Sequence, residues 1–441
     1  MPEQPFDIAV VGGGASGTLL ALHLMRQGNG RLRIALIERT PPFGSGIAYA
    51  TGCEEHLLNT RIGDMSAWPD DPGHFARWLP EGTHDFVRRR EYGRYLKDQL
   101  DRTEAASGGR LALIRADVTD LEPGDAAMTL CLGDSSTLTA RHVVLATGHR
   151  PPGPDRGALH GNPWGDATLA GLSPSASLLL IGTGLTMVDL VVALSDHGHH
   201  GGIVAVSRRG LLPRAHSPEA PKTAPGEPSA VLLAGELSKR LAAFRRLVRE
   251  GTPWGALMLA LRPHNAALWR QLDSRQQQRF VRHLRPWWDV HRHRVAPDAG
   301  RMIESRIESG KLAIIKGRIL SLDAAADKVE ARVATAAAPS GNVMRFDRTI
   351  DCRGPRNDIA EDAGLIARLA ERGLAQPDAL RFALAVDGDD RLIDQTGKAS
   401  RQLFALGPPT RGRHWEITAI PDIRKRAAAL AARLTDELVS G

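Results

Sequence analysis

Cysteine is scarce in this 441-residue sequence: there are three, Cys53, Cys131 and Cys352, and they lie far apart in the chain. An odd number of widely spaced cysteines argues against both a disulfide framework and a zinc knuckle, and it fits the reducing cytosol. Cys53 is also not part of a Cys-x-x-Cys or Cys-x4-Cys pair. We therefore expect a cytoplasmic protein that does not work as a disulfide reductase.

Long apolar runs and aromatic side chains are scarce as well. No apolar run approaches the roughly 18–20 residues that a membrane span needs, and residues 1–5 lack the basic and apolar regions of a secretory signal. The net charge is +7, but only 5% of the residues are aromatic, and no basic motif with interleaved aromatics occurs. We therefore expect neither a membrane nor a nucleic acid as partner, and the excess of arginine suggests an anionic small-molecule substrate.

What the sequence does contain is a dinucleotide-binding pattern near its start. An apolar run, 8–11, precedes Gly12-Gly13-Gly14-Ala15-Ser16-Gly17, and a helix-compatible segment and a second apolar run ending in Glu38 follow. In this fingerprint the first glycine makes the turn, the second lets the backbone approach a pyrophosphate, and the third lets helix and strand pack closely. Glu38 follows Gly12 by 26 residues, where a carboxylate accepts hydrogen bonds from ribose hydroxyls.

The pattern occurs again about 170 residues later. Residues 177–194 read as strand, Gly182-Thr183-Gly184 turn and helix, and residues 202–210 read as the second strand. Arg208 follows Gly182 at the offset at which Glu38 follows Gly12. An arginine at this place accommodates the 2′-phosphate of NADP, whereas an acid prefers the free hydroxyl of NAD. The pattern predicts a second site that prefers NADPH to NADH, with Arg208 and Arg209 in contact with the nucleotide.

One residue of the second unit departs from the fingerprint. Met187 stands where the first unit has Gly17, and its bulk would loosen the packing of helix against strand. An empty, vestigial nucleotide fold is therefore the alternative for this unit.

The remaining segments suggest the domain organisation. Residues 111–144 read as a small antiparallel β-meander, residues 211–301 as an insertion, helical in its second part, and the strands return from residue 311. We predict an α/β fold with two Rossmann-like dinucleotide-binding domains. The first dinucleotide-binding domain would have two parts, residues 1–165 and 346–441, and the second, NAD(P)-binding domain would span residues 166–345.

The whole chain resembles the flavoproteins with two dinucleotide-binding domains, which include glutathione-reductase-like enzymes and flavin N-hydroxylating monooxygenases. More narrowly, it resembles a bacterial group of FAD/NAD(P)-binding proteins. The resemblance is carried by residues 44–79 and by "VRRREYGRYL", "GTGLTMVDL", "SRRGLLPRAH", "WWDVHRHRVAP" and "HWEITAIPDIR". These segments span nearly the full length of the chain.

The resemblance implies that the first unit holds FAD. The implied cofactor contacts are Gly12, Gly14, Ala15, Ser16, Gly17, Glu38, Arg39, Asn59, Thr147, Gly148, Gly407 and Ile420, with Gly182, Gly184, Arg208 and Arg209 for NADP. A helix beginning near Ile420 would point its N-terminus at the pyrimidine edge of the flavin, although it could also be a plain structural helix. Many relatives have a Gly-Asp pair where this chain has Gly407-Pro408-Pro409.

The implied activity is that of an FAD-dependent oxidoreductase that uses NADPH. The resemblance favours a monooxygenase that forms a hydroperoxyflavin with O2 and oxygenates a small molecule, as in N-hydroxylation. One alternative is a dehydrogenase, oxidase or reductase without oxygen insertion. Another is a non-enzymatic flavin-binding protein whose basic insertion docks an acidic partner. No catalytic residue is assigned.

Three further clusters contain residues that could carry chemistry. His160-x-x-x-Trp164 is half of a Baeyer–Villiger pattern, but Pro154 and Arg156 break it, so the segment reads as a linker. The histidines of 291–294 alternate at an expected helix end, and those of 197–200 lie in a loop without supporting carboxylates. A metal site needs convergent ligands with supporting partners, which neither group supplies, so we expect no metal site. Within 291–294, Arg292 and Arg294 bind a phosphate or substrate carboxylate, or pair with local acids such as Asp289. Tryptophans of the insertion either roof a substrate pocket or fill the insertion's own core: Trp254, Trp287 and Trp288.

Overall fold

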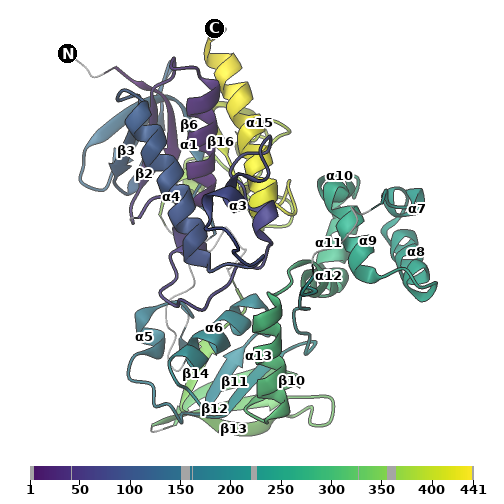
Figure 1. Ribbon diagram of the computed structural model, residues 1–441. Coiled ribbons are helices and arrows are strands. Elements are labelled where there is room, and N and C mark those ends of the chain that lie inside the picture. Colours follow the sequence, from purple (N-terminus) through teal and green to yellow (C-terminus); the bar gives the residue numbers. More distant parts are fainter. Residues whose placement is uncertain are drawn as a thin grey trace.

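The computed structural model describes residues 4–40, 42–149, 159–160, 162–219, 226–325, 327–354 and 364–439. The beginning and the end of the chain together form an upper lobe, and the middle of the chain forms a lower lobe (Figure 1). A group of short helices projects beside them. No helix among these residues is long and apolar enough to cross a membrane.

The upper lobe is built on one eight-stranded sheet. Its main path runs β15-β16-β6-β1-β2-β3, and β5 joins β4 to β6. The strands are β1 (Phe6–Val11), β2 (Ile34–Glu38), β3 (Leu111–Arg115), β4 (Val118–Pro123), β5 (Met128–Leu132), β6 (Thr137–Leu145), β15 (Arg391–Ile393) and β16 (Ala399–Ala405). The strands β16, β6, β1, β2 and β3 pair in parallel, while β4, β5 and β15 pair antiparallel.

Both faces of this sheet are covered, which is why its strands are almost continuously apolar. Along β1, Ile8 and Val10 face one core and Ala9 and Val11 face the other. The first core is closed by α1 (Ala15–Gln27), α4 (Arg89–Ala106) and α15 (Ile420–Val439), and α1 packs against both of the others. The second core is closed by β4, β5 and α14 (Leu365–Glu371). Three short elements connect them: α2 (Gly46–Tyr49), η1 (Ile62–Asp64) and α3 (His74–Trp78).

The predicted meander was wrong for its first strand. β3 pairs in parallel with β2, from Ile34 opposite Leu111 to Glu38 opposite Arg115. A parallel pair needs a crossover of a dozen or more residues, usually a helix, and α4 supplies it. The antiparallel strands begin only at β4.

The lower lobe has a five-stranded parallel sheet in the order β10-β9-β8-β14-β7. Its strands are β7 (Leu159–His160), β8 (Leu178–Ile181), β9 (Ile203–Ser207), β10 (Leu312–Lys316) and β14 (Arg348–Asp351). Its helices are α5 (Asp166–Leu169), α6 (Leu185–Asp196) and α13 (Pro297–Glu308), and β11 (Arg318–Ala325), β12 (Lys328–Ala334) and β13 (Asn342–Phe346) form a small antiparallel sheet. Strand β7 precedes and strand β14 follows residues 166–345, the range predicted for the second domain. The sheet of the lower lobe therefore includes residues on both sides of that range.

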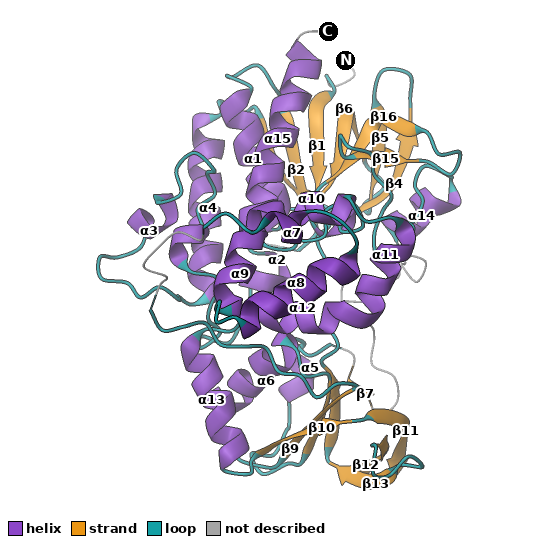
Figure 2. Cartoon of the chain, turned by 90° about the vertical axis from the view of Figure 1, so that its right-hand side faces the viewer, coloured by secondary structure: helices purple, strands orange, loops and turns teal. Residues whose placement is uncertain are grey.

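The insertion is helical from residue 230. It consists of α7 (Ala230–Leu233), α8 (Leu237–Arg249), α9 (Trp254–Leu261), η2 (Arg262–His264), α10 (Asn265–Arg270), α11 (Ser274–Arg279), the π-helix η3 (Phe280–Leu284) and α12 (Arg285–Arg292). Seen from its own side, it lies in front of the junction between the two lobes (Figure 2). It has a small apolar core of its own, and a second cluster joins it to Trp415 of the upper lobe.

Candidate cofactor and substrate site

The first glycine turn is built so that only glycine fits at two of its positions. Gly12 has a φ of +108°, and a Cβ there would lie 2.5 Å from the carbonyl oxygen of Ala146. A Cβ at Gly17 would lie 1.8 Å from the carbonyl oxygen of Gly12. Gly14 caps α1 without a side-chain hydrogen bond. The first amides of α1 are therefore left to an external acceptor, and the helix dipole favours an anion.

Glu38 ends β2 directly beside this turn. Its Oε2 accepts a hydrogen bond from the amide of Gly13 at 2.8 Å, and its Oε1 accepts one from the amide of Thr40 at 3.0 Å. A carboxylate has about four acceptor positions, so Glu38 retains capacity for ribose hydroxyls. The neighbouring Arg39 is exposed.

Segments far apart in sequence meet at the same turn. Gly407 has a φ of +80°, and a Cβ there would lie 2.5 Å from Oγ of Ser16. Thr147 and Gly148 follow the carbonyl of Ala146, against which Gly12 packs. Gly407 caps a short 3-10 helix, η5 (Pro408–Thr410). Pro408 and Pro409, which stand where many relatives have a Gly-Asp pair, therefore form a helical turn.

Ile420 is the first residue of α15. Its side chain is buried in the core that α15 shares with α1. α15 begins at the end of the upper lobe nearer the lower lobe and ends at the C-terminus (Figure 1). The N-terminus of α15 therefore lies towards the lobe junction.

The second turn repeats the geometry of the first. Gly182 has a φ of +116°, and a Cβ there would lie 2.6 Å from the carbonyl oxygen of Cys352. Gly184 caps α6 with nearly the backbone angles of Gly14, again without a side-chain hydrogen bond. Met187 is fully buried in the core beneath α6. Its bulk therefore does not prevent the strand–turn–helix unit from forming.

The basic residues after β9 lie beside this turn. Oγ1 of Thr183 donates a hydrogen bond to Oγ of Ser207 at 2.8 Å, which joins the glycine turn to the end of β9. Arg208 is exposed, and Arg209 donates to the carbonyl oxygen of Arg282 in the insertion at 3.4 Å. Arg208 therefore extends into solvent next to the second turn, while Arg209 links that turn to the insertion.

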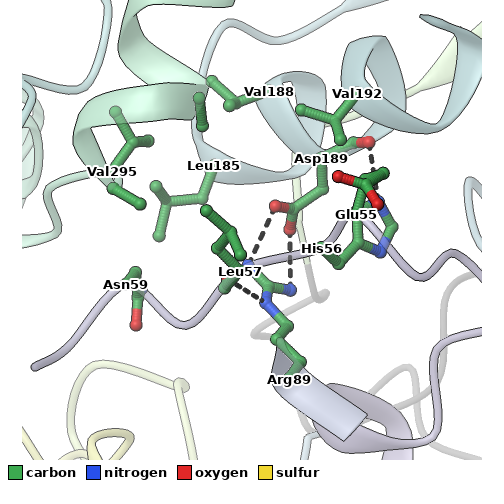
Figure 3. Close-up of a pocket in the computed structure, with 12 residues that line it drawn as sticks. Glu55, His56, Leu57, Asn59, Arg89, Leu185, Val188, Asp189, Val192 and Val295 are labelled. Carbon is green, nitrogen blue, oxygen red and sulfur yellow. Dashed lines mark hydrogen bonds and ion pairs between the residues drawn. The ribbon is translucent and has the colours of Figure 1, made fainter. Parts of the chain in front are cut away.

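A buried ion pair holds the two lobes together. The guanidinium of Arg89, on α4, contacts both carboxylate oxygens of Asp189, on α6, at 2.8 and 2.9 Å (Figure 3). Nε2 of His56 donates to the backbone oxygen of Asp189 at 2.8 Å. Beside them, Asn59 and Leu185 line a cavity of about 20 Å³. That volume holds about one water molecule, so this cavity is not a substrate pocket.

Asn59 lies at the lobe junction, where it lines the small cavity. Its backbone oxygen accepts a hydrogen bond from Nε2 of His216 at 3.1 Å. Trp164 packs its ring against His56 at 5.8 Å between centroids. His160 lies on β7, and Pro154 and Arg156 lie outside the described residues.

The two arginines of the 291–294 cluster have different environments. Nε of Arg292 lies 3.0 Å from Oε2 of Glu416, and its Nη2 lies 3.7 Å from Asp422. Arg294 has no acidic partner among the described residues, and its guanidinium lies over the ring of Trp254 at 5.6 Å. Asp289 pairs instead with Arg285, at 3.3 Å.

The tryptophans of the insertion also differ in role. Trp288 lies in the cluster that joins the insertion to Trp415, and its Nε1 donates to Glu416 at 2.7 Å. Trp287 is 47% exposed, and Trp254 stacks edge-on against His291.

Sequence reasoning did not single out Arg89, Glu416 or Arg411. Arg411 lies over the ring of Trp415 at 4.8 Å without an acidic partner among the described residues. Burial, and then the charge of Arg285, lowers its pKa to about 10. All three residues lie in or beside segments that carry the resemblance, "VRRREYGRYL" and "HWEITAIPDIR", but the sequence gives no sign of their partners.

The environment of His216 predicts a loss of stability in acid. Burial, and then the charge of Arg294, lowers its pKa from 6.5 to about 4. Between pH 6.5 and pH 4 the unfolded chain therefore binds a proton that the folded chain does not, so stability falls as the pH falls through this window. Above pH 6.5 His216 adds no pH dependence. We expect His216→Gln to narrow the difference in melting temperature between pH 7.5 and pH 4.5, and exposed His84→Gln to leave it unchanged. An equal difference in both variants would contradict this assignment.

Comparisons with known proteins agree with the fold. Residues 9–150 match the model of a family described as FAD-NAD(P)-binding, and no curated protein matches the chain. Among solved structures, an ornithine N-hydroxylase from Kutzneria sp. 744, with reduced FAD, NADP+ and L-ornithine, has a TM-score of 0.68 at 15% identity. The match covers 98% of this chain and 100% of that one. A cadaverine monooxygenase from Erwinia amylovora has 0.61 at 14% identity, covering 100% and 95%. A thioredoxin reductase from T. acidophilum has 0.55 at 11%, covering 99% and 100%. The predicted architecture of two dinucleotide-binding domains is thus confirmed.

Proposed function

We propose that this protein is a cytoplasmic FAD-dependent oxidoreductase that takes electrons from NADPH and uses O2 to oxygenate a small molecule. One observation carries the proposal: the same glycine turn is built twice. In each turn, a glycine of positive φ packs against a carbonyl that follows a parallel strand, and an uncapped helix begins three residues later. Two such turns, one in each lobe, are what two dinucleotides require.

The residues of the first turn fit FAD. Gly12 and Gly17 allow close backbone packing, the uncapped amides of α1 would hold the pyrophosphate, and Glu38 would accept the ribose hydroxyls. Bound FAD would supply the redox chemistry, which no side chain provides. In the second turn, the amides of α6 would hold the pyrophosphate of NADPH, and Arg208 its 2′-phosphate.

Two observations favour oxygen as the electron acceptor. The three cysteines are all free and lie far apart in the chain, and burial raises the pKa of the thiols of Cys53 and Cys352. Such thiols are poor redox nucleophiles. Two of the solved structures that resemble this chain over nearly the full length of both chains are monooxygenases, an ornithine N-hydroxylase and a cadaverine monooxygenase.

The test is to mix the purified protein, without oxygen, with NADPH and then with NADH while following the flavin absorbance. We expect rapid bleaching by NADPH and slower bleaching by NADH. Bleaching must then be reversed by air, and substrate must increase consumption of both NADPH and O2. A flavin that neither nucleotide reduces would rule out this use of the second turn, and electrons would then have to come from the substrate itself.

A variant separates nucleotide preference from general damage. Arg208→Gln removes an exposed charge without a described partner, so we expect the fold to persist. Loss of a charge-assisted contact corresponds to about tenfold weaker NADPH binding, with little change for NADH. Equal effects on both nucleotides would contradict the role of Arg208.

A further inference from the structure

The arginines near Asn59 form a cluster in which one guanidinium lacks a counter-charge. Arg61 pairs with Asp85, Arg262 with Asp64 at 2.9 Å, and Arg292 with Glu416 at 3.0 Å. Arg294 pairs with no acid among the described residues, and its Nε is buried without a hydrogen-bond partner. Arg294 is partly buried, and removing a charge from water without a counter-charge is unfavourable, so its retention needs an explanation.

Arg294 stands where the three parts of the molecule meet. It follows α12, the last helix of the insertion. Val295 packs into the core of the lower lobe and lines the small cavity together with Asn59 of the upper lobe. His216 joins this point to the segment that carries Arg61: its amide donates to the carbonyl oxygen of Val295 at 2.9 Å, and its Nε2 donates to the backbone oxygen of Asn59 at 3.1 Å. Burial lowers the pKa of Arg294, and the charges of Arg292, Arg61 and Arg262 lower it further.

The charge of the insertion adds to this excess. Residues 226–294 contain 13 Lys and Arg against five Asp and Glu, a net charge of +8, whereas the whole chain has +7. The remainder of the chain is therefore almost neutral, and its positive field originates at the insertion. A field of this kind draws anions towards the junction.

We propose that Arg294 is the centre of an anion-binding site for a carboxylate or phosphate group of a ligand that enters between the lobes. The identity of the ligands in this proposal rests on the proposed function. The binding of an anion at Arg294 does not depend on it. Two sources fit the chemistry: the substrate itself, or the pyrophosphate of NADPH, because Val295 lies beside Leu185 at the start of α6. Such a cluster disfavours a cationic diamine as substrate.

The test is calorimetric titration of the flavin-loaded protein, at low ionic strength, with inorganic pyrophosphate, with glutarate and with NADP+. We expect wild type to bind at least one of the two small anions, and Arg294→Gln to weaken that binding at least tenfold. Arg294→Lys keeps the charge but loses the planar fork, and should fall between them. The control is Arg270→Gln, since Arg270 is an exposed arginine of the insertion without an acidic partner among the described residues; it should bind as wild type does.

The three titrations distinguish an anion of the nucleotide from an anion of the substrate. If Arg294→Gln weakens pyrophosphate and NADP+ binding together, the anion is that of the nucleotide. If it weakens glutarate binding and leaves NADP+ unchanged, the anion is a substrate carboxylate. The proposal is overturned if the wild type binds neither small anion, or if Arg294→Gln binds them as the wild type does. The role of Arg294 would then be its contact with the ring of Trp254. If anion binding depends on Arg294 but NADPH does not reduce the flavin, the anion-binding site is supported and the proposed reaction is contradicted.

Discussion

Gly17→Ala should yield a protein that is purified without its yellow cofactor. The added Cβ would lie 1.8 Å from the carbonyl oxygen of Gly12 and 3.0 Å from its carbonyl carbon. Both atoms belong to the backbone of the turn, so no rotamer change relieves the clash, and α1 must move away from β1. Since α1 is buried against α15 and α4, we expect a loss of about 3 kcal/mol or more, the upper end of overpacking effects.

The measurement is the ratio of flavin absorbance to protein absorbance after purification, with urea unfolding beside it. Gly52→Ala is the matched control, because a Cβ at Gly52 would meet no atom within 4 Å and its φ is not in the left-handed region. We expect the control to retain its flavin and its unfolding midpoint. A Gly17→Ala protein with full flavin content would show that this turn does not hold the cofactor.

The glycine turns are the part of the molecule that the sequence could predict. Gly12 and Gly182 are required by local backbone geometry, and the strand before and the helix after each lie within about 15 residues. Such local patterns are readable because the interactions that enforce them are between neighbours in sequence. The helical insertion was readable for the same reason, from the spacing of its apolar residues.

The sheet edges and the lobe junction were not readable. The parallel pairing of β3 depends on a crossover by α4, and nothing within β3 itself distinguishes it from a meander strand. Similarly, the 291–294 cluster left open whether its arginines pair with acids or bind an anion. The partner of Arg292 lies more than 120 residues away, at Glu416, whereas Arg294 has no acidic partner among the described residues. Only the three-dimensional structure shows that these two neighbouring arginines have different environments.

Glu416→Gln should release the insertion from the upper lobe. Glu416 is 5% exposed, and it accepts from Nε1 of Trp288 while facing Arg292. Burial would raise its pKa, but Arg292, and then His293 and the Trp288 hydrogen bond, hold the pKa below its usual range. The side chain is therefore charged in the folded protein. Neutralising it leaves Arg292 with only Asp422, at 3.7 Å, and uncompensated buried charges cost about 3–5 kcal/mol.

Tryptophan fluorescence reports directly on this contact, because Trp288 and Trp415 lie in the cluster that joins the insertion to the upper lobe. We expect the urea midpoint of the fluorescence transition to fall strongly in Glu416→Gln. In the control, Glu330→Gln, the lost partner is Arg345, whose side chain is 70% exposed; exposed pairs contribute about 1 kcal/mol or less, so little should change.

The double variant Arg292→Met/Glu416→Leu decides why the single one fails. Replacing both members of a buried ion pair by apolar side chains is often close to neutral, whereas removing one leaves a charge unpaired. If the loss in Glu416→Gln comes from the unpaired Arg292, the double variant should be more stable than either of its single variants, Arg292→Met and Glu416→Leu, and the cycle of these three should show strong coupling. If the losses simply add, the two residues act independently, and the insertion would be held by its tryptophan cluster rather than by the ion pair.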